Sequence, residues 1–141
     1  MIVKFYDQVE DEKLKFAVIA ARAEGKWVFC KHKARTTFEM PGGHREPGEP
    51  ILDTARRELQ EETGATAFDL QPVCVYSVTD PDNFDGAETY GLLCTAQVHA
   101  FGPMDSEMEK IVLTADLPTQ WTYPQIQPKL LVELERRGVI Q

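Results

Sequence analysis

The chain has 141 residues, a length typical of one domain with a single hydrophobic core. Its formal net charge of −8 disfavours non-specific binding to a nucleic-acid backbone or to an anionic membrane. No apolar run approaches the roughly 20 residues that span a bilayer, and residues 1–12 lack the apolar stretch of a signal peptide.

The three cysteines, Cys30, Cys74 and Cys94, are widely spaced and form no metal-ligand doublet. This pattern indicates free thiols in a reducing compartment, so we expect a cytoplasmic protein. We also expect the partner to be a small molecule and not a nucleic-acid polymer or a membrane. The sequence leaves open whether the protein is a monomer or a homodimer.

Apolar and β-branched residues concentrate at 14–22 and 27–32, and the short Ala-Glu-Gly-Lys break between them predicts a β-hairpin. A short strand is expected at 36–40, followed by a helix that begins at Glu49 or Pro50 and ends at Thr63. Beyond it the pattern predicts three strands and a second helix, at residues 70–78, 89–98, 110–113 and 125–137. Two helices and several strands without a regular alternation predict an α/β domain with a mixed sheet.

Three carboxylates stand close together on the first expected helix. Glu58, Glu61 and Glu62 are three and four residues apart, so they lie on neighbouring positions of the helix surface. A solvated face with salt bridges is the common interpretation of such a helix. The glycine-rich segment before it favours the other interpretation, in which a hard divalent cation neutralises the carboxylates.

The same segment resembles the Nudix box, at residues 43–65. The defining positions are filled by Gly43, Glu49, Arg57, Glu58, Leu59, Glu61, Glu62, Gly64 and Ala65. Ala65 stands where the family usually has Ile, Leu or Val, a change that affects local packing and leaves the chemistry intact. The resemblance implies a Nudix-type α/β/α sandwich formed by a single domain over residues 1–141.

The resemblance also implies an activity, the hydrolysis of a nucleoside diphosphate linked to another moiety with Mg²⁺ or Mn²⁺. The metal ligands would be Glu58, Glu61 and Glu62 with a backbone carbonyl of Gly42 or Gly43, and Glu61 is either a ligand or the general base. Arg57 would orient a carboxylate such as Glu49 or Glu61. Family members often take the general base from a loop outside the box, which makes Glu107 and Glu109 candidates here. Gly43 and Glu49 are further candidates for contact with the substrate.

The substrate is less defined by the sequence. The short chain resembles Nudix enzymes that convert nucleoside triphosphates, including 8-oxo-dGTP, to the monophosphate and pyrophosphate. Base recognition would then fall to the segment before the last helix, where Trp121 or Tyr123 could stack on a base and Gln125 or Gln127 could hydrogen-bond its edge. Core packing is the alternative interpretation of the two aromatic residues.

Pro81 supports a rival substrate, because a proline near this distance from the box is similar to that of Nudix enzymes acting on ADP-ribose. A plain turn explains the same residue equally well. Other dinucleotides and sugar nucleotides stay open as substrates. A non-catalytic nucleotide sensor is a candidate from another class, although sensors generally have a degraded box. An isoprenoid-diphosphate isomerase would need further catalytic residues.

Overall fold

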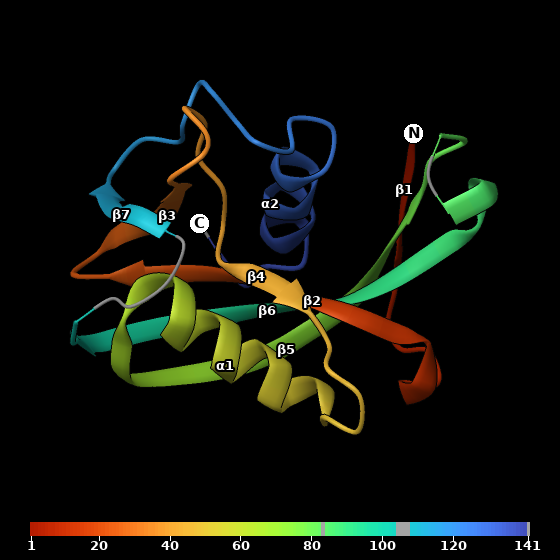
Figure 1. The fold of residues 1–141 in the computed structure, drawn as a ribbon, viewed down its shortest axis with the longest axis horizontal. Coiled ribbons are helices and arrows are strands. Elements are labelled where there is room, and N and C mark those ends of the chain that lie inside the picture. The colour runs from red at the N-terminus through yellow and green to blue at the C-terminus, as the bar shows by residue number, and fades with distance from the viewer. Residues whose placement is uncertain (83, 104–107, 141) are drawn as a thin grey trace.

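The computed structural model describes residues 1–82, 84–103 and 108–140. Over these residues a seven-stranded sheet lies between two α-helices, α1 (Ile51–Thr63) and α2 (Gln127–Arg136), which cover its opposite faces (Figure 1). The predicted α/β/α sandwich is therefore confirmed. No helix in the described ranges has the length and apolar character needed to cross a membrane.

The sheet is mixed, as expected. Its strands are β1 (Ile2–Tyr6), β2 (Leu14–Ala23), β3 (Lys26–His32), β4 (Gly42–His44), β5 (Ala65–Thr79), β6 (Glu88–Phe101) and β7 (Met108–Thr114). Their order is β1-β5-β6-β2-β3-β7, and β4 pairs with β2 outside this path. The pairing of β2 with β6 is parallel, whereas the other pairings among these strands are antiparallel. Two short 3₁₀ turns, Asp11–Lys13 and Phe84–Gly86, precede β2 and β6.

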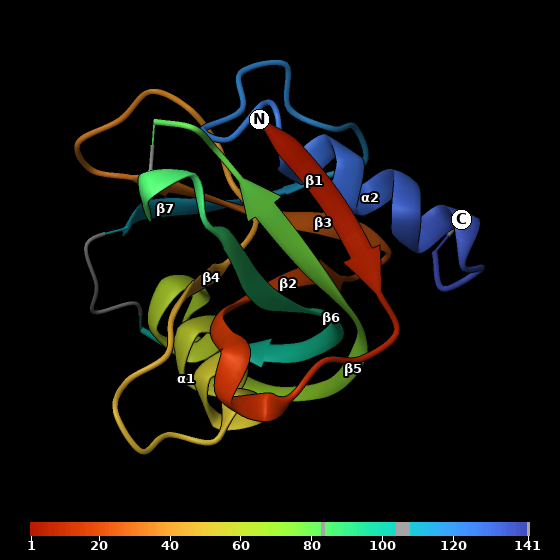
Figure 2. The same ribbon diagram turned by 90° about the vertical axis from the view of Figure 1, so that its right-hand side faces the viewer.

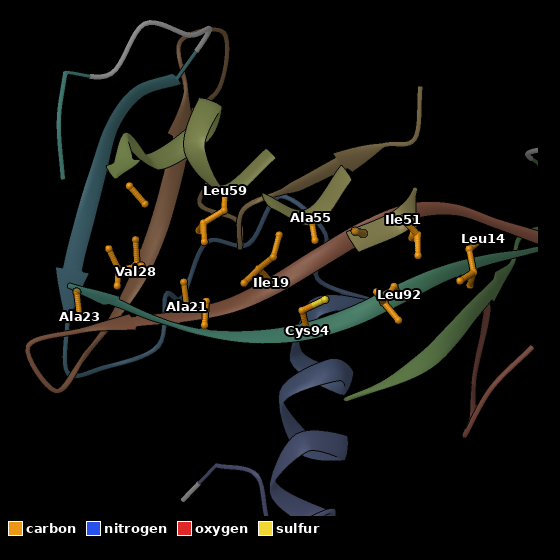
Figure 3. Packing of buried hydrophobic residues seen from close by; sticks show 14 of the residues in the cluster. Leu14, Ile19, Ala21, Ala23, Val28, Ile51, Ala55, Leu59, Leu92 and Cys94 are labelled. Carbon is orange, nitrogen blue, oxygen red and sulfur yellow. The ribbon is translucent and has the colours of Figure 1, made fainter. Parts of the chain in front are cut away.

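Strand β2 lies at the centre of the sheet and is buried on both faces, which explains its nearly continuous apolar sequence. Ile19 and Ala21 point to one side, where they pack with Ala55 and Leu59 of α1 (Figure 3). On the other side Val18 and Ala20 belong to a second cluster that contains leucines of α2, namely Leu130, Leu131 and Leu134. The two helices are thus held by opposite faces of the same strand.

The first helix follows its predicted bounds closely. It begins after Pro50, and Gly64 ends it with a φ of 76°, a left-handed conformation that favours glycine. The predicted hairpin is also confirmed, since β2 and β3 pair around a turn at residues 24–25. The second helix begins at Gln127 and not at Gln125, because a turn comes first: the backbone N–H groups of Ile126 and Gln127 both donate to the Tyr123 carbonyl.

Three strands differ from the sequence-based expectation. Residues 36–40 form only isolated bridges, at Phe38 and Glu39, whereas the Gly42-Gly43-His44 segment forms β4. Strand β5 begins directly after Gly64, five residues earlier than predicted, because it continues past the core as a half-exposed ribbon paired with β6. Strand β1 was not predicted, since its apolar and charged residues mix as they do on half-exposed edge strands.

A polar cluster fastens β1 to the sheet edge, where it lies alongside β5 (Figure 2). The Glu88 carboxylate accepts hydrogen bonds from the hydroxyls of Tyr6, Ser77 and Tyr90, at 2.6, 2.6 and 2.8 Å. Because these bonds favour the ionised form, Ser77 and the two tyrosines lower the pKa of Glu88 to about 2. The three donors come from β1, β5 and β6, so one carboxylate ties three strands together.

We expect Glu88→Gln to lower the melting temperature by several degrees at pH 6, because an amide accepts these hydrogen bonds more weakly. A carboxyl group with a lowered folded-state pKa stabilises the fold above its unfolded pKa, about 4.5, and loses that contribution as the pH falls to about 2. The gap in melting temperature between the wild type and Glu88→Gln should therefore close over this range, as followed by circular dichroism. A gap that persists at pH 2 would contradict this assignment.

Candidate active site

The glycine strand β4 lies next to α1 (Figure 1). Gly42 pairs with Val18 of β2, while the neighbouring Pro41 carbonyl accepts from the Ile19 N–H at 2.9 Å. In an antiparallel pair, hydrogen-bonded and non-hydrogen-bonded positions alternate. Gly42 follows the bonded Pro41, so both its N–H and its C=O point away from β2. Accordingly, the Gly42 N–H donates to Oε1 of Glu62 at 2.7 Å, and its carbonyl faces the same side.

Glu62 is a half-buried carboxyl group with an unusual proton affinity. Its pKa is raised to about 8, mainly by burial and also by the nearby carboxylates of Glu58 and Glu39, while the hydrogen bond from the Gly42 N–H opposes the rise. The Cys30 thiol donates to its backbone carbonyl at 3.5 Å, which fixes the end of the helix on β3. A divalent cation would displace the proton, because metal binding requires the ionised form.

Glu58 packs directly over the glycine strand. A Cβ atom on Gly43 would lie 2.5 and 2.6 Å from Oε2 and Oε1 of Glu58, closer than real Cβ atoms approach other atoms. The carboxylate is only 12% exposed and accepts a hydrogen bond from Nη1 of Arg57 at 2.7 Å. Burial raises the pKa of Glu58, and Arg57 opposes that effect.

We expect Gly43→Ala to reduce kcat/KM by about 10- to 100-fold while the melting temperature changes little. The added methyl group would displace only the flexible end of Glu58, so the fold can absorb it while the carboxylate leaves its place. Metal-dependent turnover and thermal unfolding, measured on the same preparation, test this expectation. Wild-type turnover would show that the contact between Glu58 and Gly43 has no role in catalysis.

Arg57 is the centre of an ion-pair network around the helix. Its Nε and Nη2 bind Glu49 in a two-point contact at 2.8 and 3.1 Å, and its Nη1 reaches Glu58 and, at 3.3 Å, Glu61. Nη2 also donates to the His44 carbonyl at 3.0 Å, which connects the network to β4. Arg57 and the Thr54 hydroxyl lower the pKa of Glu49 to about 2. The carboxylate of Glu49, which precedes the helix, is thus ionised and held by Arg57 and Thr54 of α1.

The carboxylate oxygens of this site are suitable ligands for a hard cation, although the side chains do not converge on one point. Within the described part of the chain, no three His, Cys, Asp or Glu side chains stand close enough to hold an ion together. Glu62 accepts the Gly42 N–H and Glu58 lies over Gly43, whereas Glu61 is 53% exposed and interacts with Arg57. The geometry therefore brings two carboxylates to the glycine strand, and carboxylate oxygens are ligands of the kind that Mg²⁺ prefers.

A cavity of about 870 Å³ opens beside these groups. At one end its wall contains Glu58, Glu62, Arg57 and the two glycines of β4. Apolar and aromatic residues of the wall come from β2, β5 and the segments before β4 and α2, with Phe16, Val18, Met40, Tyr76, Tyr123 and Ile126. Its volume falls in the range of small-molecule sites, roughly 300–1,000 Å³.

A NUDIX domain model matches residues 11–132, most of the chain. The chain belongs to the NUDIX family. Its fold is shared with the crystal structure of the Bacillus subtilis pyrophosphohydrolase BsRppH, with a TM-score of 0.79 over 99% of this chain and 93% of that one, at 24% identity. A NUDIX hydrolase from Nitrosomonas europaea aligns with a TM-score of 0.68 over 91% and 96% of the two chains, at 18% identity.

Two curated relatives carry names that refer to different substrates. The putative 8-oxo-dGTP diphosphatase YtkD of Bacillus subtilis (strain 168) is 37% identical over 76 residues, which cover 54% of this chain. The ADP-ribose pyrophosphatase of the same organism is 44% identical over 64 residues, which cover 43% of this chain. The matched segments span 48% and 35% of these two relatives, so this Nudix chain corresponds to half or less of each.

The Nudix cavity includes some of the residues expected to bind substrate and not others. Tyr123 and Gln127 line it, as does Gly43. Trp121 lies outside the cavity wall, and its ring packs edge-on against Phe29 with ring centres 5.5 Å apart, as the core-packing interpretation expects. Gln125 is exposed and is also outside the wall. Glu49 is also absent from the wall, because its carboxylate is bound by Arg57. The predicted base Glu107 lies outside the described residues, and Glu109 falls within β7.

Several residues of the cavity wall had no role in the sequence interpretation. Phe16 and Tyr76 come from β2 and β5, and their rings lie 5.4 Å apart. Glu39 is 7% exposed and Arg35 donates to its Oε1 at 3.3 Å. A signal for Glu39 existed in the sequence, since an acidic residue stands inside an otherwise apolar Phe-Glu-Met-Pro segment directly before the glycines.

Proposed function

We propose that this chain is a metal-dependent pyrophosphohydrolase that converts a nucleoside triphosphate, including an oxidised one such as 8-oxo-dGTP, to the monophosphate and pyrophosphate. The observation that carries the proposal is the composition of one cavity, which joins the carboxylates of the Nudix box to an aromatic wall. A nucleotide has the same two parts, a polyphosphate that needs cations and a flat base that stacks on aromatic rings.

The metal end of the cavity is proposed to hold Mg²⁺, or Mn²⁺, through Glu58, Glu62 and the Gly42 carbonyl. Such an ion neutralises phosphate charge and lowers the pKa of a bound water, which makes that water a nucleophile. The crowded carboxylates fit this purpose, because burial and mutual repulsion hold the pKa of Glu62 at about 8 until a cation compensates them.

The remaining roles fall to residues of the chain itself. Arg57 positions Glu58 and links it to Glu49, so that the carboxylate enters the cavity in one orientation. Glu61, the exposed carboxylate of the box, or Glu107 acts as the general base. Tyr123 and Gln127, which line the same cavity, contact the base of the substrate.

ADP-ribose is the second candidate substrate. It is supported by the relative named ADP-ribose pyrophosphatase, which has the higher identity of the two over its shorter match. It is also supported by Asp80, which lines the cavity immediately before Pro81 and brings that turn to the rim of the site.

A substrate panel with Mg²⁺ tests the proposal. It contains canonical and oxidised nucleoside triphosphates, ADP-ribose, diadenosine polyphosphates and sugar nucleotides, with products separated by chromatography. Conversion of a triphosphate to monophosphate and pyrophosphate is the expected result. Preferred cleavage of ADP-ribose would replace it with the second candidate. Nucleotide binding without any turnover would contradict both and identify a sensor.

A further inference from the structure

Glu39 is a buried carboxylate on the wall of the cavity. Its backbone is fixed by two hydrogen bonds to Cys30 of β3, at 2.8 and 3.0 Å. Its segment lies beside the one that leads into α2, because the Phe38 N–H donates to the Gln120 carbonyl and the Thr122 N–H donates to the Phe38 carbonyl (Figures 1 and 2). The main chain that carries this carboxylate is therefore held on both sides.

The carboxylate keeps capacity to accept hydrogen bonds. Arg35 donates to it at 3.3 Å, a long contact from a side chain that is 44% exposed, and the Thr122 hydroxyl also supports it. An ionised carboxyl group has about four lone-pair positions, so these contacts leave room for a ligand. Burial raises the pKa of Glu39, which reflects the free energy needed to keep a partly satisfied charge in a sheltered place.

A buried amide stands on the same wall. Gln127 is 3% exposed, and its Oε1 accepts the backbone N–H of Met40 at 2.8 Å. Because that N–H must face an oxygen, the O and N positions of the amide are set, and the NH₂ group stays a donor. The cavity wall thus contains a hydrogen-bond acceptor, Glu39, and a donor, Gln127. The two are linked because Met40, the residue after Glu39, donates its N–H to Gln127.

The surroundings of this pair fit a flat ring. Phe16 and Tyr76 form a tilted aromatic pair on one wall, and Tyr123 lies at the rim with the Arg35 guanidinium 5.8 Å from its ring centre. Aromatic walls hold nucleobases by stacking, which does not depend on which base is present. Discrimination between bases must therefore come from the polar groups.

We infer that Glu39 selects a 2-amino-6-oxopurine, the guanine base: its carboxylate accepts the adjacent N1–H and 2-amino donors while the Gln127 amide donates to the 6-oxo group. This inference rests on the proposed nucleotide cleavage and names the base it prefers. Hypoxanthine has the ring N–H without the amine, and adenine has a lone pair at N1 that an ionised carboxylate repels. The expected order is guanine, hypoxanthine, adenine.

A metal-binding role for Glu39 is the main rival, since it lies close enough to raise the pKa of Glu62. The described carboxylates do not gather into a group of three that could share an ion, and Arg35 occupies the Glu39 side of the cavity. The two roles predict different mutants. A lost metal ligand would lower turnover of every substrate alike, whereas a lost base contact changes the ratio between bases.

The test compares GTP, ITP and ATP as substrates of the wild type, of Glu39→Gln and of Glu135→Gln, an equal change at an exposed position of α2. We expect the wild type to favour GTP over ATP by about 10- to 100-fold in kcat/KM, and Glu39→Gln to lose most of this ratio, mainly through KM for GTP. Glu135→Gln should keep it. Equal losses for all three nucleotides, or no preference in the wild type, would overturn the inference.

A second measurement separates this inference from the proposed function. Binding of GMP, IMP and AMP is measured by calorimetry without metal, which needs no turnover. Preferred binding of GMP that disappears in Glu39→Gln supports the inference even where no triphosphate is cleaved. Turnover of triphosphates with equal binding of the three monophosphates overturns it and leaves the proposed function in place.

Discussion

Glu58→Gln and Glu62→Gln are each expected to lower kcat/KM by more than about 100-fold at saturating Mg²⁺, because an amide is a neutral and weaker ligand for a hard cation. Changes in residues that only orient metal ligands reduce metal affinity or activity by about 10- to 100-fold, so the loss of a ligand should exceed that range. The two side chains lie against Gly43 and Gly42 of β4, and among the described residues Arg57 is the one cationic side chain bonded to them.

Steady-state kinetics over a range of Mg²⁺ concentrations measures this effect, and Mn²⁺ binding followed by electron paramagnetic resonance gives a readout that does not need turnover. Glu135→Gln on the exposed side of α2 is the matched control. Near-normal activity in either purified variant would remove that residue from the metal site. Glu61→Gln adds information: reduced kcat with unchanged Mn²⁺ binding would identify Glu61 as the general base.

Arg57→Lys is expected to reduce kcat/KM by about 10- to 100-fold although the positive charge is kept. A lysine ammonium is a point charge and cannot reproduce the two-point contact with Glu49 together with the bonds to Glu58 and the His44 carbonyl. The Glu58 carboxylate would then lose its fixed orientation. An ordinary surface ion pair would show almost no change after the same substitution.

A double-mutant cycle with Glu49→Gln tests whether Arg57 acts through Glu49. Because the two side chains form one contact, the double variant should lose little more than the single variants. Fully additive losses would show that Glu49 contributes separately, for example by touching the substrate. Melting temperatures of all four proteins control for changes in the fold.

The sequence predicts the part of the candidate site that is local. The bounds of α1, its stop at Gly64 and the relative positions of Glu58 and Glu62 all follow from the geometry of one helix, in which residues three and four apart are neighbours. The contact between Arg57 and Glu49 was also expected, because both lie on or next to that helix.

The rest depends on contacts between distant segments. Phe16 and Tyr76 meet across 60 positions of the chain, and their place on one cavity wall follows only from the strand order of the sheet. Trp121 and Tyr123 are two residues apart and have the same aromatic character, yet one packs on Phe29 and the other reaches the cavity. A pattern of residue types cannot distinguish them, because the residues that each ring contacts are distant in the sequence.

Strand β4 shows why the box cannot work as an independent fragment. The Gly42 and Gly43 backbone is held by β2, and β2 in turn pairs in parallel with β6, where Ile19 lies opposite Cys94. Parallel pairing over such a separation requires closure of a long loop, which makes it a late and slow event in folding. A peptide of residues 43–65 would contain Glu49, Glu58, Glu61 and Glu62 and still lack the strands that position them. During refolding, metal affinity should therefore return together with the completed sheet and not with the earlier formation of helix.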